Sequence, residues 1–89
     1  MEVTIRIPST LRTWSGGREF IALDAATVEE ALVALDRLHP DIRARLCDES
    51  GRLRRFVRVF VGEVDIRTRE GQQMALRDGD LLDIVQAIC

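Results

Sequence analysis

The 89-residue sequence predicts an α+β fold, in which a mixed sheet of four to five strands carries one main helix packed on one face. Three observations predict this fold class. Several short runs alternate apolar and polar residues, one segment repeats its apolar residues at helical spacing, and glycine or proline turn signals separate these segments. A chain of this length forms a single domain, residues 1–89, with a modest hydrophobic core.

The first strand is expected at residues 2–7, where apolar and polar residues alternate, and Pro8 ends it. The pair Gly16-Gly17 predicts a turn and not a phosphate-binding loop, because no helix follows it. A second strand is expected at residues 18–23. The residues of both strands that should face the core are Val3, Ile5, Ile7, Ile21 and Leu23.

The main helix is expected to begin after Thr27. The Thr27 hydroxyl can accept a hydrogen bond from the backbone N–H of Glu30, and Glu30 can reach back, which is the pattern of a capping box. Pro40 disfavours the helical conformation in the residue before it, so the helix should end near His39. We therefore interpret His39 as a C-terminal cap and not as a catalytic base. The inward residues at helical spacing are Val28, Ala31, Leu32, Leu35 and Leu38.

A short helical turn is expected at residues 41–47, followed by a polar loop at residues 48–53. Ile42 and Leu46 should face inward, and Cys47 should pack as a small hydrophobic residue. Two cysteines and one histidine are too few for a structural zinc site or an iron–sulfur cluster, so we expect no metal site.

The strongest strand signal is at residues 55–61, where β-branched valines occupy alternate positions. We assign these valines to the core, which leaves an arginine between two phenylalanines on the outer face. The inward residues are Val57, Val59 and Val61, and the outward residues are Phe56, Arg58 and Phe60. A short strand is expected at residues 64–67.

The last strand is expected at residues 81–89, after a tight turn at Asp78-Gly79-Asp80. Its residues are apolar and favour the β conformation up to Cys89. The inward residues are Leu82 and Ile84, and the outward residues are Asp83 and Val85.

The net charge of −2 disfavours a nucleic-acid binder that depends on a basic field, despite the group Arg52, Arg54, Arg55 and Arg58. No apolar run approaches the roughly 20 residues of a membrane span. The N-terminus has neither the basic start nor the apolar stretch of a signal peptide. We therefore expect a cytoplasmic protein with no nucleic-acid or membrane partner. All 13 basic residues are arginine, so no lysine side chain can accept a conjugate.

The predicted order of elements is that of the ubiquitin-like β-grasp, and the sequence resembles the sulfur-carrier family of the MoaD, ThiS and CysO type, the CysO type most. The resemblance extends over essentially the whole chain. The segments that carry it are residues 3–8, 11–12, 16–17, 27, 53–61, 65–67 and 78–80.

The resemblance implies a protein cosubstrate and not an enzyme. In that family an E1-like enzyme of the MoeB or ThiF type uses ATP to adenylate the carboxylate of a C-terminal Gly-Gly pair. A sulfur source then converts it to a thiocarboxylate, which supplies cysteine, molybdopterin, thiamin or natural-product biosynthesis. Glycines permit a close backbone approach inside a narrow active site. The implied partners are the E1-like enzyme and a sulfur-acceptor enzyme, and the carrier binds no cofactor of its own.

The end of the sequence departs from the family pattern. Cys89 falls where the family has the residue before Gly-Gly, so we assign it to the carrier position. Three interpretations stay open. The sequence is truncated or altered, or the protein naturally lacks the tail and serves as an interaction module, or Cys89 is itself the working group, for example as a persulfide.

The β-grasp order would place the last strand between the first and the third, so that their outward side chains share one open face. Asp83 is then expected between Arg6 and Arg58 in a cross-strand ion arrangement. Aromatic residues and arginine are enriched at protein interfaces. The predicted partner interface is Arg6, Phe56, Arg58, Phe60, Val85 and Ala87. The rival interpretation is an interaction module that uses this face and never carries sulfur.

Overall fold

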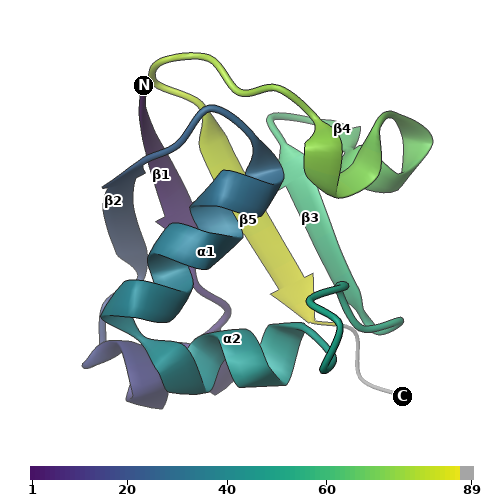
Figure 1. The fold of residues 1–89 in the computed structure, drawn as a ribbon. Coiled ribbons are helices and arrows are strands. Elements are labelled where there is room, and N and C mark those ends of the chain that lie inside the picture. The colour runs from purple at the N-terminus through teal and green to yellow at the C-terminus, as the bar shows by residue number, and fades with distance from the viewer. Residues whose placement is uncertain (87–89) are drawn as a thin grey trace.

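The structure, a computed structural model, describes residues 1–86. Within these residues, one α-helix crosses a face of a single mixed sheet, and a second, shorter α-helix lies beside the first at one end of the sheet (Figure 1). The strands are β1 (Glu2–Arg6), β2 (Phe20–Asp24), β3 (Val57–Val61), β4 (Val64–Asp65) and β5 (Leu81–Gln86). The α-helices are α1 (Val28–Leu38) and α2 (Pro40–Leu46), and the short 3-10 helices are η1 (Ser9–Ser15), η2 (Ile66–Thr68) and η3 (Gly71–Gln73).

The strand order across the sheet is β2-β1-β5-β3-β4. β1 and β5 are parallel, and the other neighbouring strands are antiparallel. The predicted α+β fold is therefore confirmed, and so is the place of the last strand between the first and the third. β5 has neighbours on both sides, which makes it a central strand of the sheet.

The hydrophobic core lies between the sheet and the two helices (Figure 1). Alternate residues of the strands point into it, as the period of two requires. Cys47 is buried with them, as predicted. The sheet contributes Val3, Ile5, Ile21, Leu23, Val57, Val59, Leu82 and Ile84, and the helices contribute Val28, Ala31, Leu32, Leu35, Ile42 and Leu46.

The N-terminus of α1 has the predicted cap, with one difference. The Thr27 hydroxyl accepts from the Glu30 backbone N–H at 3.1 Å. The Glu30 carboxylate reaches back to the backbone N–H of Ala26 at 3.1 Å, one residue before the cap. His39 is the C-terminal cap of α1, and its backbone N–H donates to the Leu35 carbonyl at 2.7 Å. The interpretation of His39 as a cap is confirmed.

The prediction that Leu38 faces the core is wrong, because its side chain is 55% exposed. α1 ends at this residue, and α2 begins two residues later at Pro40. Ile42 and Leu46 of α2 are fully buried, so α2 continues the apolar face that Leu38 would have extended.

β3 begins two residues later than expected, and this corrects the position of Phe56. The chain turns just before the strand, where the backbone N–H of Val57 donates to the Arg54 carbonyl at 3.0 Å. Phe56 lies in this turn and packs half-buried against the core. Its predicted place on the outer face of the strand is therefore wrong.

The predicted turns are present, although their surroundings differ from the expectation. Gly16 and Gly17 both have positive φ angles, 68° and 82°, which glycine adopts readily. The segment before them, expected as a plain connection, contains η1. β4 is shorter than predicted, because the Asp65 side chain caps η2 by accepting from the Arg67 backbone N–H at 2.9 Å.

Candidate functional site

The sheet face opposite the helices is open, and one row of side chains crosses all five strands on it. The register fixes this row. Arg6 of β1 stands between Phe20 of β2 and Asp83 of β5, and Phe60 of β3 stands between Asp83 and Asp65 of β4. Two phenylalanines therefore flank a central arginine and aspartate. We call this set, Phe20, Arg6, Asp83, Phe60 and Asp65, the central row.

Further apolar side chains lie on both sides of the central row. Val85 stands opposite Arg58, and Leu81 stands opposite Thr4. Val85 is 41% exposed, Leu81 is 39% exposed and Phe20 is 52% exposed. A folded monomer gains little by leaving such residues in water, and grouped exposed apolar residues mark interaction sites. The arrangement can therefore bind the apolar surface of a protein partner.

Ion pairs tie the charged residues of this face together. The Arg6 guanidinium lies between two carboxylates, with Nη1 at 3.8 Å from Asp83 Oδ2 and Nε at 3.2 Å from Glu19 Oε2. The expected pairing of Asp83 with Arg6 is present, but the pairing with Arg58 is not. Asp83 stands opposite Phe60, and Arg58 Nη1 pairs with Asp65 Oδ2 at 3.9 Å instead. Arg6 and Arg58 are thus each paired with a neighbouring carboxylate. The open face therefore combines exposed apolar side chains with paired charges, as mixed contact surfaces do.

The structure brings together four of the predicted interface residues on the open face: Arg6, Arg58, Phe60 and Val85. Phe56 is not among them, and Ala87 and the carrier position Cys89 lie outside the described residues. Sequence reasoning missed Phe20 and Leu81. Strict alternation could have found Phe20, because its neighbour Ile21 was already assigned to the core.

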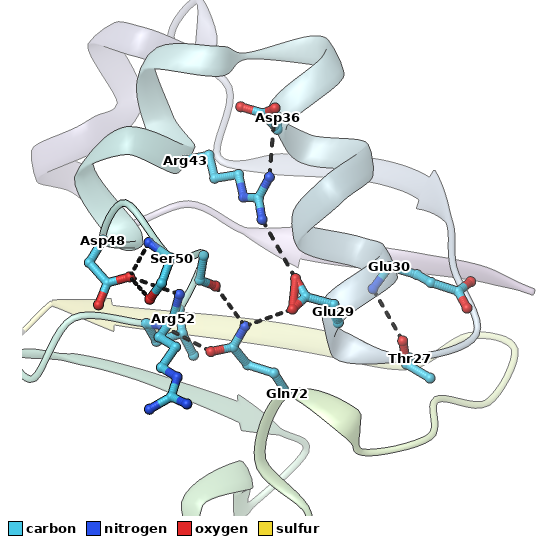
Figure 2. A network of polar contacts seen from close by, with 11 residues as sticks. Thr27, Glu29, Glu30, Asp36, Arg43, Asp48, Ser50, Arg52 and Gln72 are labelled. Carbon is cyan, nitrogen blue, oxygen red and sulfur yellow. Dashed lines mark hydrogen bonds and ion pairs between the residues drawn. The ribbon is translucent and has the colours of Figure 1, made fainter.

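A second candidate is a cleft of about 450 Å³ on the helix side of the sheet. Figure 2 shows the polar network beside it, which includes the lining residues Glu29, Ser50, Arg52 and Gln72. The Gln72 carboxamide donates to Glu29 Oε2 at 3.1 Å and to the Gly51 carbonyl at 2.9 Å, and it accepts from the Leu53 backbone N–H at 2.9 Å. Glu29 also lies 3.6 Å from Arg43 Nη2. Glu29 Oε1 accepts no hydrogen bond among the described residues and has only this ion pair. The Gln72 hydrogen bonds connect α1, η3 and the loop at residues 48–53, so we assign the residues around the cleft a structural role.

The titratable groups on the helix side show no catalytic arrangement among the described residues. Burial raises the pKa of the Cys47 thiol above its usual value, so the thiol stays protonated near neutral pH and is a poor nucleophile. Hydrogen bonds from the Ser50 hydroxyl and, to a smaller extent, the Arg52 backbone N–H lower the pKa of Asp48. These hydrogen bonds stabilise the loop, so we assign Asp48 a structural role and not a catalytic one. Within residues 1–86, no group of three metal-binding side chains occurs, and no helix is long and apolar enough to cross a membrane.

Comparison with known proteins agrees with this geometry. The ThiS family model matches residues 5–89. The sulfur carrier protein CysO of Mycobacterium tuberculosis is 34% identical over 90 residues, which cover 99% of this chain and 97% of that protein. Its crystal structure superposes with a TM-score of 0.89, covering 97% of this chain and 99% of that one.

Two further solved structures extend the comparison. The Amycolatopsis orientalis BexX/CysO complex contains a chain that is 38% identical, with a TM-score of 0.91 and coverage of 98% of this chain and 97% of that chain. SAMP1 from Haloferax volcanii is 22% identical, with a TM-score of 0.85 and coverage of 99% and 97%. At that identity SAMP1 shows the shared fold alone. The predicted resemblance and fold are both confirmed.

Proposed function

Because this chain belongs to the ThiS family, we propose that it works as a sulfur carrier, a protein cosubstrate and not a catalyst. The observation that carries the proposal is the identity with the sulfur carrier protein CysO over nearly the full length of both proteins. The open face supports it, because a carrier must dock on the enzymes that load and unload it. A chain built this way needs no catalytic residues of its own.

In this proposal, loading would take place at the C-terminal carboxylate of the carrier. An E1-like enzyme would join this carboxylate to the adenylyl group of ATP and release pyrophosphate. A sulfur donor would then displace AMP and leave a thiocarboxylate. Activation as an acyl adenylate makes the carboxyl carbon electrophilic, and the partner enzyme supplies both the ATP site and the catalytic groups. The chain itself contributes recognition through the central row and its apolar neighbours.

The second partner in this proposal is a sulfur-acceptor enzyme. The pathways that such a carrier can supply are cysteine, molybdopterin, thiamin and natural-product biosynthesis. The similarity to CysO favours a partner of the cysteine-synthase type. The solved complex of BexX with CysO supports the idea that proteins of this kind form defined complexes with other proteins.

Intact mass spectrometry tests the proposal directly. The chain is incubated with ATP, an E1-like enzyme and a sulfide donor, both as given and with Gly-Gly appended. An oxygen-to-sulfur exchange at the C-terminus that requires ATP supports the carrier function, and a shift only in the extended protein assigns the chemistry to the Gly-Gly pair. No exchange in either protein with several E1-like enzymes, together with partner binding that survives deletion of residues 88 and 89, would favour the rival interaction module.

A further inference from the structure

The last described residue of β5, Gln86, is held from two directions. Its backbone pairs with Val57 at the beginning of β3. Its side-chain Oε1 accepts a hydrogen bond from the Thr10 hydroxyl at 2.8 Å, and Thr10 lies 76 positions away in η1. Gln86 therefore connects the end of the closing strand to η1 near the beginning of the fold.

Arg67 holds the beginning of β3, the strand end that pairs with Gln86. Arg67 Nη2 donates to the Val57 carbonyl at 2.7 Å and to the carbonyls of Arg54 and Arg55 at 3.3 and 3.0 Å. Hydrogen bonds from a charged donor are stronger than those between neutral groups. The turn before β3, and with it the strand end that faces Gln86, is thus fixed from the η2 segment.

The η1 side is anchored independently of Thr10. Leu11 is buried in the core, and Arg12 Nε donates to the Ile7 carbonyl at 3.2 Å. The Ser15 hydroxyl donates to the Arg12 and Arg18 carbonyls, at 3.0 and 2.8 Å. Thr10 itself is exposed, so its hydroxyl contributes little to the burial that stabilises η1. The Thr10–Gln86 bond thus joins a segment that is already held to the end of β5.

We propose that the Thr10–Gln86 hydrogen bond is a positioning contact that orders the end of β5, the last described segment before the carrier position. This inference rests on the proposed function. Binding of the carrier end in an enzyme active site costs less conformational entropy when the preceding residue, Gln86, is already ordered. Thr10 and Gln86 act through this ordering and touch no reacting atom.

The substitution Thr10→Val tests the contact, because valine keeps the shape and loses the hydroxyl. In the Gly-Gly-extended chain, we expect the KM for loading by the E1-like enzyme to rise about two- to tenfold, the cost of one hydrogen bond, with kcat unchanged. Thr10→Ser should restore the original KM. Thr13→Val is the matched control, since Thr13 lies on the same η1 helix, is exposed and makes no hydrogen bond through its side chain among the described residues. The melting temperatures of the unmodified, Thr10→Ser and Thr13→Val proteins should agree, and that of Thr10→Val should fall by at most a few degrees, as the loss of one exposed hydrogen bond does.

A measurement without enzyme makes the test independent of loading. The NMR heteronuclear NOE of the Gln86 backbone and side-chain amides should fall in Thr10→Val and stay unchanged in Thr13→Val. Equal Gln86 order in all variants would overturn the inference, whatever the kinetics show. Normal loading of Thr10→Val would overturn it as well. Failure of the unmodified and extended chains to be loaded at all would instead contradict the proposed function, which separates the two ideas.

Discussion

The two faces of the sheet are built from the same strands but differ in almost every property. On the helix side, Ile5, Val59 and Leu82 are essentially fully buried. On the open side, their strand neighbours Arg6 and Phe60 lie in a row of charges and aromatic rings. Apolar and polar residues alternate along each strand, so every strand supplies one apolar face, which the helix side covers, and one mixed face, which stays open. If the open face is the partner surface, as we propose, substitutions on the two faces should change stability and partner binding separately.

The largest expected effect is on the helix side. Leu35 of α1 is fully buried against the sheet, so Leu35→Ala should lower the free energy of unfolding by about 2–5 kcal/mol, through lost burial and the cavity left behind. Denaturant unfolding followed by circular dichroism measures this loss. Leu38→Ala on the same helix is the control, because at 55% exposure the loss should be small. Equal losses in both variants would contradict the assignment of the α1 faces.

The next effect should fall mainly on binding, with a modest loss of stability, because an acidic side chain at position 60 stands opposite Asp83 and Asp65. Phe60→Asp places a charge in the central row, and we expect it to weaken binding to a cognate E1-like enzyme about 30-fold or more, as loss of an interface hot spot does. Calorimetry measures the affinity, and a circular dichroism melt measures the fold.

Phe56→Asp gives the contrast that sharpens this comparison. Phe56 precedes the same strand but packs against the core, so the same change there should lower the melting temperature. A collapse of the Phe60→Asp melt, with a normal melt for Phe56→Asp, would reverse the assignment of the two phenylalanines.

The sequence was sufficient for the fold because periodicity reports which side chains are buried. The alternation in β1, β3 and β5 and the cap at Thr27 correctly predicted the strands, the helix and the face of each central residue. The errors occur where an element ends. Leu38 and Phe56 both fit a periodic pattern, but the pattern cannot show where hydrogen bonds stop and the chain turns.

The open face could be predicted only in part, because its details depend on long-range register. Phe20 joins the central row since β2 pairs with β1 so that Phe20 stands opposite Arg6. Arg58 pairs with Asp65 because β4 lies beside β3. Neither relation follows from local spacing. The Thr10–Gln86 contact joins positions 76 residues apart and has no signal in the sequence.

The smallest expected effect concerns the ion pair at the centre of the open face. Arg6 and Asp83 have side chains 46% and 34% exposed, so water screens their attraction and the pair should contribute at most about 1 kcal/mol to the free energy of unfolding. A double-mutant cycle with Arg6→Met and Asp83→Asn isolates this coupling. The same cycle measured for partner binding should give a larger coupling, because docking removes water from the pair and strengthens the attraction. Equal couplings in the free and bound protein would mean that the central row stays solvated in the complex, and would place the contact surface elsewhere on the molecule.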